Sequence, residues 1–126
     1  SHGLNRLPLY IDDIKTGHCI TEGSPQIINE TPATAYVDGQ NLLGFVVAQF
    51  CMKTAIKKAK EVGVGWVVTK GSNHFGTADT FTVMAAQEGL IGFCCTNTSP
   101  LVCTMGGKKP FFGTNPLSVA AFGHEK

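Results

Sequence analysis

A chain of 126 residues with 43% hydrophobic content is long enough to bury one moderate core and no more than one domain. Its formal charge of +1, from ten basic and nine acidic residues, provides no electrostatic footprint for nucleic acid or for an anionic membrane surface. Lysines interrupt the longest apolar region, so we expect no transmembrane span and take a small molecule as the default partner.

The cysteines favour a reducing compartment. They are odd in number, and they lack the spacing of metal ligands, so no metal site is expected. Two of them are adjacent inside an apolar run that is typical of a strand. Reduced and mostly buried thiols in the cytoplasm are therefore favoured over a disulfide framework. The five cysteines are Cys19, Cys51, Cys94, Cys95 and Cys103.

Proline and glycine positions set the first elements of the chain. Pro8 suits the first position of a helix, which we expect to continue to Lys15 and to be stopped by Gly17. A short turn precedes it, with Ser1 as its candidate N-cap. Residues 18–31 are expected to form a loop.

Two strands and a long helix are expected next. Ala33–Val37 is a short apolar strand closed by Asp38-Gly39. Leu42–Val62 has apolar residues at helical spacing, and Gly63 provides the C-terminal stop. Val64–Thr69 is a run of strand formers without alternation, so this strand should be buried on both faces.

The second half of the chain continues the alternation of helix and strand. A helix is expected from about Thr77 to Glu88, followed by strands over Leu90–Thr96 and, after a region rich in loop signals, Leu117–Phe122. This order predicts an α/β fold with right-handed crossovers and at least partly parallel pairing. The last strand lies near the end of the sequence, so further sequence is expected to complete the sheet.

His74 lies in a turn between an expected strand and an expected helix, Lys70–Ala78. Open α/β sheets bind their ligands at the carboxyl ends of their strands, where this turn would lie. The dipole of the following helix disfavours a charged imidazole, and a neutral imidazole suits general acid/base catalysis. The alternative is that His74 merely caps the turn.

A second group of candidate residues lies at the start of the chain. His2 and Arg6 are four residues apart and share one face if this stretch is helical. A histidine beside an arginine fork is suited to hold a carboxylate and to exchange a proton with a neighbouring hydroxyl. Tyr10 would extend the same face. The alternatives are a frayed terminus or a purification-tag remnant for Ser1-His2, and core packing for Tyr10.

Two polar loops precede or follow expected strands. Thr96–Pro100 and Gly113–Pro116 carry hydroxyl and amide groups suited to ribose and phosphate oxygens, although structural Asx or Ser/Thr turns have the same composition. Gly63-Val64-Gly65 precedes a strand instead of following one, which disfavours a Rossmann dinucleotide fingerprint. The sequence also contains no Walker-type phosphate loop.

Together these motifs resemble the malate/L-lactate dehydrogenase family of the second type, which includes ureidoglycolate and sulfolactate dehydrogenases and cyclic imino acid reductases. The order and approximate spacing of the motifs agree over essentially the whole chain. The motifs are Ser1-His2-Gly3 with Arg6 and Tyr10, Ser72-Asn73-His74-Phe75-Gly76, Thr96-Asn97-Thr98-Ser99-Pro100, Gly106-Gly107 and Gly113-Thr114-Asn115-Pro116.

The resemblance implies an α/β fold that is not a Rossmann fold: a three-layer mixed sheet with helices on both faces, in a homodimer. It implies hydride transfer between NAD or NADP and a small 2-hydroxy acid of the malate or lactate type, or the matching 2-oxo acid. Because members of the family are longer, the chain is expected to be an internal fragment. Residues 1–31 would then be a substrate-side segment, and residues 32–126 part of the cofactor domain.

The resemblance also assigns roles to residues. His74 resembles the family's active-site histidine, and His2 with Arg6 resembles its substrate-side pair, in which Arg6 would hold the substrate carboxylate. Its location makes His74 the favoured acid/base, with His2 second. Ser1 and Tyr10 fall on the same substrate-side motif. The cofactor-lining positions are Thr96, Asn97, Ser99, Pro100, Thr114, Asn115 and Pro116.

A hypothesis from another functional class, a protein that is not an enzyme, is also open. The chain would then be a catalytically silent domain of the same fold that acts in dimerisation or regulation. Binding of NAD(H) or NADP(H) without turnover of any 2-oxo acid would favour that alternative. No acidic residue can be tied to ribose recognition, so the choice between NAD and NADP is also open.

Overall fold

The computed structural model describes residues 4–123, and its chain forms two compact units, Ser1–Thr77 and Ala78–Lys126. The boundary between these compact units lies at residues 77 and 78, whereas the functional segments predicted from the sequence are 1–31 and 32–126. Those functional segments stay a prediction. The first unit contains η1 (Leu4–Arg6), α1 (Leu7–Lys15), β1 (Gln26–Glu30), β2 (Thr34–Leu42), α2 (Gly44–Val62) and β3 (Trp66–Ser72). The second contains α3 (Ala78–Gln87), β4 (Gly92–Cys95), β5 (Val102–Cys103), β6 (Pro110–Phe112) and β7 (Leu117–Ala120).

The helices begin and end close to where proline and glycine predicted. α1 has its proline in the first turn, and Gly17 follows it with a φ of +77°. α2 ends at Gly63, whose φ of +89° is the left-handed conformation of a C-terminal stop and whose N–H donates to Ala59 O at 2.8 Å. α3 agrees with its expected bounds within one residue at each end. The expected N-cap Ser1 lies outside the described residues.

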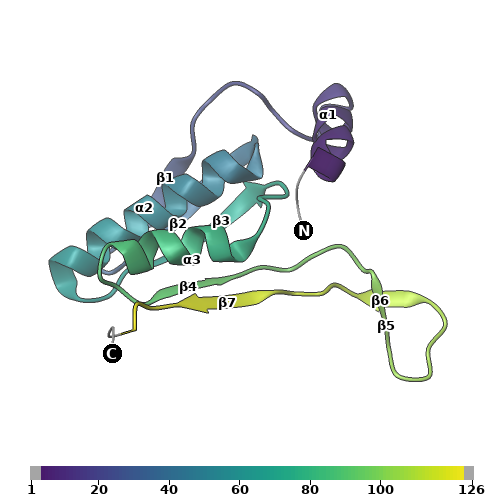
Figure 1. Cartoon of the computed structure of the whole chain (residues 1–126). Coiled ribbons are helices and arrows are strands. Elements are labelled where there is room, and N and C mark those ends of the chain that lie inside the picture. Colours follow the sequence, from purple (N-terminus) through teal and green to yellow (C-terminus); the bar gives the residue numbers. More distant parts are fainter. Residues whose placement is uncertain (1–3, 124–126) are drawn as a thin grey trace. The chain divides into compact units, whose positions relative to one another are not determined.

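A mixed three-stranded sheet in the order β1-β2-β3 forms the centre of the first unit. β2 and β3 are parallel, as the alternation predicted, whereas β1 is antiparallel to β2. α2 connects the two parallel strands and packs against both (Figure 1). Val37 from β2 and Val47 from α2 are fully buried, so the core of this unit lies between helix and sheet.

The expectation of loop over residues 18–31 is wrong for β1. All five residues of this strand are exposed, so it is an edge strand with no buried face and no hydrophobic alternation to reveal it. The buried side chain of Lys58 on α2 ties it to the helix. Its Nζ lies 2.8 Å from Glu30 Oε2 and donates to Thr31 O at 2.7 Å.

β2 continues past Asp38-Gly39, which the sequence predicted as its end. Gln40 and Asn41 have left-handed φ values of 53° and 55°, and the pairing register with β3 shifts at this point. The Asp38 carboxylate accepts the Gln40 N–H at 2.9 Å, which stabilises the irregular turn. The strand then resumes at Leu42. A turn signal therefore marked a bulge inside a strand and not its end.

β3 is not buried on both faces, contrary to the prediction. Exposed and half-buried residues alternate along the strand, with Trp66 and Val68 each 51% exposed. In this unit α2 is the helix that packs against β2 and β3, and it covers one face. A run of strand formers thus cannot distinguish a strand covered on both sides from one covered on one side only.

The second unit is a helix packed on a hairpin of distant strands. β4 pairs antiparallel with β7. Among the described strands, the parallel pairing that the sequence predicted is found between β2 and β3. α3 packs on both β4 and β7, and its fully buried Thr82 lies 3.0 Å from the Ser118 hydroxyl of β7. Gly92 permits this packing, because a Cβ there would lie 2.2 Å from Thr82 O. The final strand ends at Ala120 and not at Phe122.

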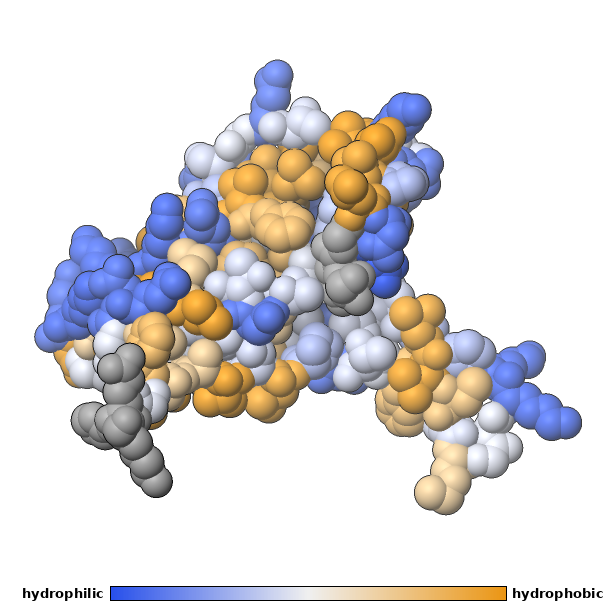
Figure 2. Space-filling model, in the orientation of Figure 1, coloured by the Kyte–Doolittle hydropathy of each residue, from blue (hydrophilic) through white to orange (hydrophobic). Residues whose placement is uncertain are grey.

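Large apolar side chains remain exposed in both units. Figure 2 shows apolar surface over α1 and over the β5–β6 end of the hairpin. Exposed residues there include Leu4 at 87%, Leu101 at 69% and Phe111 at 72%. Contiguous apolar surface of this kind is typical of a surface that packs against another part of a protein or against a partner.

The cysteines are all unpaired, as expected for reduced thiols. Cys19 is buried and Cys51 and Cys94 are half-buried, but Cys95 and Cys103 are exposed, so the expectation that most are buried is only partly correct. Burial raises the pKa of the Cys51 and Cys94 thiols. Within residues 4–123, no helix has the length and apolar character to cross a bilayer, and no His, Cys, Asp and Glu cluster is suited to hold a metal.

Protonation of Glu30 should weaken the link between β1 and α2. The hydrogen bond and charge of Lys58 lower the pKa of Glu30 below its ordinary value. A carboxyl whose pKa falls on folding stabilises the folded state above its unfolded pKa and loses that contribution as the pH falls through the folded pKa. The free energy of unfolding in urea should therefore decrease over this acidic range.

Glu30→Gln should make that decrease smaller, because the group no longer titrates. Glu22→Gln changes an exposed carboxyl in the loop before β1 and serves as the matched control. We expect the control to keep the pH dependence of the unmodified protein. The same pH dependence in both variants would contradict the role given to the Glu30–Lys58 pair.

Candidate functional site

The site is built where two parallel strands end side by side. Leu42 at the end of β2 pairs with Ser72 at the end of β3, so the segments that follow both strands leave the sheet at one edge. Gly44 begins α2 there. A Cβ on Gly44 would lie 2.2 Å from Asn73 O and 2.4 Å from His74 O. The missing side chain therefore lets the backbone of His74 lie directly against the start of α2.

Asn73 fixes the same turn from the side of β2. Its Nδ2 donates to Asn41 O at 2.8 Å and to Leu42 O at 3.2 Å, the last two residues of that strand. The turn after β3 is thus tied to the end of the neighbouring strand by a side chain. The prediction that His74 follows a strand at the carboxyl edge of a parallel pair is confirmed.

The His74 side chain meets Tyr10, which lies 64 positions away in the sequence. The Tyr10 hydroxyl is 2.8 Å from His74 Nδ1, and the two ring centroids are 5.7 Å apart. The Gly76 N–H donates to the same nitrogen at 3.3 Å. The structure therefore brings together a residue of α1 and a residue of the strand-to-helix turn that the sequence had placed in separate motifs.

Phe45 supports this pair. Its ring packs edge-on against Tyr10, with centroids 6.1 Å apart and an interplanar angle of 76°. Gly76 borders the same ring, because a Cβ there would lie 2.6 Å from Phe45. Gly76 also has a φ of +87°, which disfavours any side chain. Gly76 of the turn and Phe45 at the start of α2 thus pack closely against each other beside Tyr10.

Arg6 acts on the same hydroxyl through its charge. Burial raises the pKa of Tyr10, and the positive charge of Arg6 acts in the opposite direction, so the two side chains are close enough to interact. The net effect keeps Tyr10 a neutral hydroxyl at neutral pH. Arg6 Nε is buried and has no hydrogen-bond partner among the described residues. A buried guanidinium N–H without an acceptor is costly, so its chemistry fits an anion such as a carboxylate.

Two other predicted residues of this group lie outside the described part of the chain. They are Ser1 and His2. Their expected roles, with His2 as the second candidate for acid/base catalysis, stay predictions.

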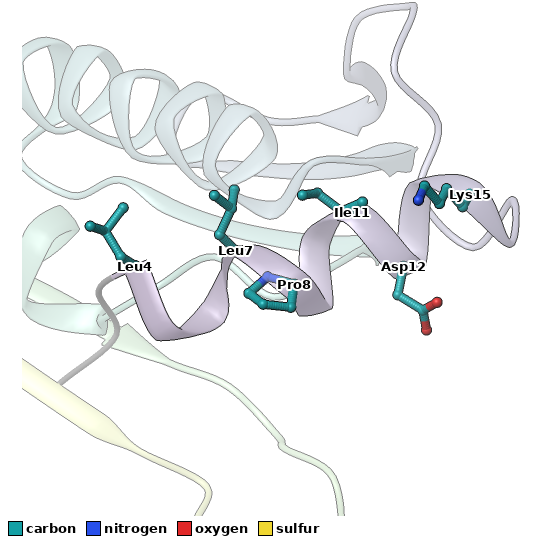
Figure 3. Close-up of a pocket in the computed structure, with 6 residues that line it drawn as sticks. All are labelled: Leu4, Leu7, Pro8, Ile11, Asp12 and Lys15. Atoms are coloured by element: carbon teal, nitrogen blue, oxygen red, sulfur yellow. The ribbon is translucent and has the colours of Figure 1, made fainter.

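A shallow groove of about 390 Å³ runs along η1 and α1 but does not include Tyr10 or His74. Figure 3 shows Leu4, Leu7 and Ile11 in a row along it, with Pro8, Asp12 and Lys15 as its other lining residues. This mainly apolar lining is typical of a packing surface. The Tyr10–His74 contact lies outside it, so we place the candidate site at His74 and not in the groove.

The predicted cofactor-lining residues lie in the second unit, on one continuous two-stranded ribbon (Figure 1). Beyond the β4–β7 pairs, the Thr96 N–H donates to Pro116 O at 3.3 Å and the Leu101 N–H to Phe112 O at 2.9 Å. β5 and β6 then pair antiparallel. The two polar loops are therefore opposite sides of the same ribbon, and the sequence did not predict β5 or β6.

Thr98 links the two loops, although the sequence did not single it out. Its Oγ1 accepts the Thr114 N–H at 2.7 Å and the Asn115 N–H at 3.4 Å, while Asn115 Oδ1 accepts the Thr98 N–H at 3.1 Å. Gly113 packs closely here, since a Cβ would lie 2.3 Å from Thr98 O. Its position among three hydroxyl residues was the available signal, but the spacing of 16 residues to Thr114 could not be foreseen.

Comparison with known proteins decides the family. The sequence pattern described as malate/L-lactate dehydrogenase matches residues 1–126. The chain belongs to the malate/L-lactate dehydrogenase family. It is 44% identical over 125 residues to an L-sulfolactate dehydrogenase of Methanocaldococcus jannaschii, covering 99% of this chain and 36% of the relative. It is 47% identical over 120 residues to a malate/(S)-sulfolactate dehydrogenase of Methanothermus fervidus, covering 95% and 35% respectively.

The fold is that of malate/L-lactate dehydrogenases. The solved structure of malate dehydrogenase from Pyrococcus horikoshii superposes with a TM-score of 0.93 at 44% identity, covering 99% of this chain and 36% of that chain. The α/β fold with a mixed sheet that the resemblance predicted is thereby confirmed. The chain spans about a third of the length of the relatives that it matches.

The ribbon offers donor groups that fit the nicotinamide cofactor implied by the malate/L-lactate dehydrogenase family. Asn97, Ser99 and Thr114 are exposed and present amide and hydroxyl groups, which suit ribose and phosphate oxygens. Asn115 adopts a left-handed φ of 43°, but its Oδ1 is already occupied by the Thr98 N–H. Part of the predicted set is thus engaged in holding the loops, and the cofactor roles themselves stay proposals.

Thr98→Val should loosen the ribbon between its two polar loops. Valine has nearly the shape of threonine but removes the acceptor of the Thr114 N–H, and losing such a bond at a half-exposed site costs about 1 kcal/mol. The Thr114 amide should then exchange with deuterium several-fold faster. Thr96→Val removes a hydroxyl whose bond is to the adjacent residue, Asn97 O, and should leave that exchange unchanged. Unchanged exchange in Thr98→Val would contradict the link.

Proposed function

We propose that this protein is an oxidoreductase that interconverts a small 2-hydroxy acid and the matching 2-oxo acid with NAD or NADP. The observation that carries the proposal is the group of Arg6, Tyr10 and His74: the imidazole contacts the phenol hydroxyl, and the Arg6 guanidinium, whose buried N–H has no acceptor within residues 4–123, acts on the same hydroxyl through its charge. An anion-binding group next to an acid/base group is what a hydroxy acid requires. Membership of the malate/L-lactate dehydrogenase family supports it.

Arg6 would bind the carboxylate of the substrate. Its guanidinium can form two parallel hydrogen bonds with a carboxylate, which fixes both the position and the plane of the acid. The chain contains a single arginine, so no other described side chain offers this fork. Holding the carboxylate on Arg6 orients the adjacent C2 oxygen for proton exchange.

His74 would exchange the proton of that C2 oxygen. In oxidation the imidazole accepts the proton of the hydroxyl, and in reduction it returns the proton to the oxo oxygen. His2, which the sequence placed second, is the alternative acid/base. When bound, the nicotinamide supplies or takes the hydride. The residues that would hold it are Thr96, Asn97, Ser99, Pro100, Thr114, Asn115 and Pro116.

The names of the relatives favour one part of the substrate range. Malate and sulfolactate are 2-hydroxy acids that carry a second acidic group on C3, whereas C3 of lactate is itself an unsubstituted methyl group. We therefore propose an oxo acid with a second acidic group, such as oxaloacetate, as the first substrate to test and pyruvate as the comparison. We further propose a cytoplasmic homodimer in which exposed apolar surface is covered.

The direct test is an assay of the purified protein with NADH or NADPH and a panel of 2-oxo acids. Loss of absorbance of the reduced nicotinamide measures turnover. Turnover of oxaloacetate or its C3-sulfonated analogue above pyruvate would support the proposal. Cofactor binding without turnover of any oxo acid would instead favour the silent-domain alternative.

His74→Ala should lower kcat about 100-fold or more, because it removes the acid/base group. The circular dichroism spectrum of the folded variant should match that of the unmodified protein. His18→Ala changes an exposed histidine in the loop before β1 and serves as the control. An unchanged kcat in His74→Ala would transfer the acid/base role to His2, which His2→Ala would then test.

Arg6→Lys should raise KM for the oxo acid about 10-fold or more while changing kcat less. Lysine keeps the charge but cannot bind a carboxylate through two parallel N–H groups. Lys15→Ala, at the exposed far end of α1, is the control that leaves the cluster intact. A KM that stays within error of the unmodified protein would remove Arg6 from the substrate site.

A further inference from the structure

The helical segment that carries Arg6 and Tyr10 lies outside the hydrophobic core of its unit. η1 and α1 follow each other directly, and all residues of α1 belong to the described part of the chain, where they are exposed or half-buried. Apolar burial, the main force that packs one element on another, therefore contributes little to the position of this helix. Its place relative to His74 depends on a few directed contacts instead.

One of these contacts lies within α1, and another lies in the loop that follows it. The Tyr10 hydroxyl is 2.8 Å from the imidazole, and a contact at one residue leaves a helix free to pivot about it. The loop adds a second point. The N–H of the buried Cys19 donates to Asp13 O of α1 at 2.9 Å. The Ile20 N–H donates to Asn41 O of β2 at 2.8 Å, so the end of α1 is tied to the end of β2.

The side chain of Asn73 joins this loop to the turn after β3. Its Nδ2 donates to Asn41 O at 2.8 Å, to Leu42 O at 3.2 Å and, more weakly, to His18 O at 3.4 Å. Three carbonyl oxygens around one atom require that atom to be the amide nitrogen, because the amide oxygen cannot donate. Asn41 O thus accepts from both Ile20 and Asn73. Asn41 also has a left-handed φ of 55°, a conformation that persists where surrounding bonds hold it.

We propose that Asn73 is a positioning residue that sets the distance between Arg6 and His74. The contacts form a closed path, from His74 through Tyr10 into α1, along the loop to the end of β2, and back through the Asn73 amide. Without this amide the turn and the loop lose their link, and the helix can shift about its contact at Tyr10. Such a shift changes the distance between the group that binds the carboxylate and the group that exchanges the proton. This effect on catalysis rests on the proposed function, whereas the link itself is testable without turnover.

Hydrogen exchange and proton NMR test the link. In Asn73→Ala we expect the Ile20 amide to exchange with deuterium about 10-fold faster or more, because the loop is freed to open locally. Cross-peaks between the ring protons of Tyr10 and His74 should weaken as well. Asn29→Ala removes an exposed amide side chain on β1 and is the control that should change neither signal. An unchanged exchange rate of Ile20 in Asn73→Ala would overturn the proposal.

Asn73→Asp separates hydrogen bonding from packing. Aspartate has nearly the shape of asparagine, but at neutral pH its charged oxygens cannot donate to the carbonyl groups that surround this side chain. Ile20 should therefore exchange at least as fast in Asn73→Asp as in Asn73→Ala. Asn29→Asp introduces the same charge at an exposed site and should leave the exchange unchanged. Exchange in Asn73→Asp equal to that of the unmodified protein would show that the side chain only fills space and would overturn the proposal.

The unmodified protein provides a measurement that needs no variant and so decides even if the variants do not fold. The side-chain amide protons of Asn73 should exchange with water several-fold more slowly than those of the exposed Asn29, because carbonyl oxygens hold them. Equal exchange rates for the two side-chain amides would overturn the proposal.

Kinetics separate positioning from a merely structural role. In Asn73→Ala we expect kcat per folded molecule to fall about 10-fold or more, because a small misplacement of reacting groups is costly, with KM for the oxo acid changed less than about threefold. A structural role would lower the free energy of unfolding in urea and leave kcat per folded molecule unchanged, which would overturn the positioning role. If His74→Ala retains full turnover, the proposed function of His74 fails, while the exchange of Ile20 still decides the link.

Discussion

The parallel pairing of β2 with β3 is the constraint on which the candidate site depends. It brings the carboxyl ends of both strands to one edge, so the start of α2 and the turn that carries His74 must lie directly against each other. Gly44 makes this sharing possible, since any Cβ there would collide with the carbonyl groups of Asn73 and His74. Tyr10 and Phe45 then fill the region around the imidazole. The chemistry thus follows from a close backbone approach that a single side chain would prevent.

Most helices could be predicted from local signals, whereas several strands could not. Pro8, Gly17 and Gly63 act on their own segment of backbone, so their effect is readable without tertiary structure. β1 lacks a buried face, and its existence depends on β2 as a partner. β2 continues after Asp38-Gly39 because a carboxylate stabilises a bulge and β3 offers further pairing. Pairing partners decide these cases, and they lie outside any local window.

The candidate site divides in the same way. The place of His74 at a strand end could be predicted, because strand order and the rule for parallel sheets suffice. Its contact with Tyr10 could not, since 64 residues separate the two and no pattern encodes how α1 docks. Thr98 escaped notice for the same reason: its importance lies in a partner loop 16 residues away. Motif residues were found as separate groups, and the structure supplies their partners.

The bond between Thr98 and the opposite loop has a consequence for the loop lengths that this chain can tolerate. One hydroxyl and one amide side chain set the distance between two loops that leave β4 and enter β7. An insertion in either loop would carry Thr98 or Asn115 out of reach and leave backbone amides on the other side without their acceptors. The two loops are therefore structurally coupled, and a change in the length of one must be matched by a change in the other. Changes of side chain at the exposed positions between them carry no such restriction.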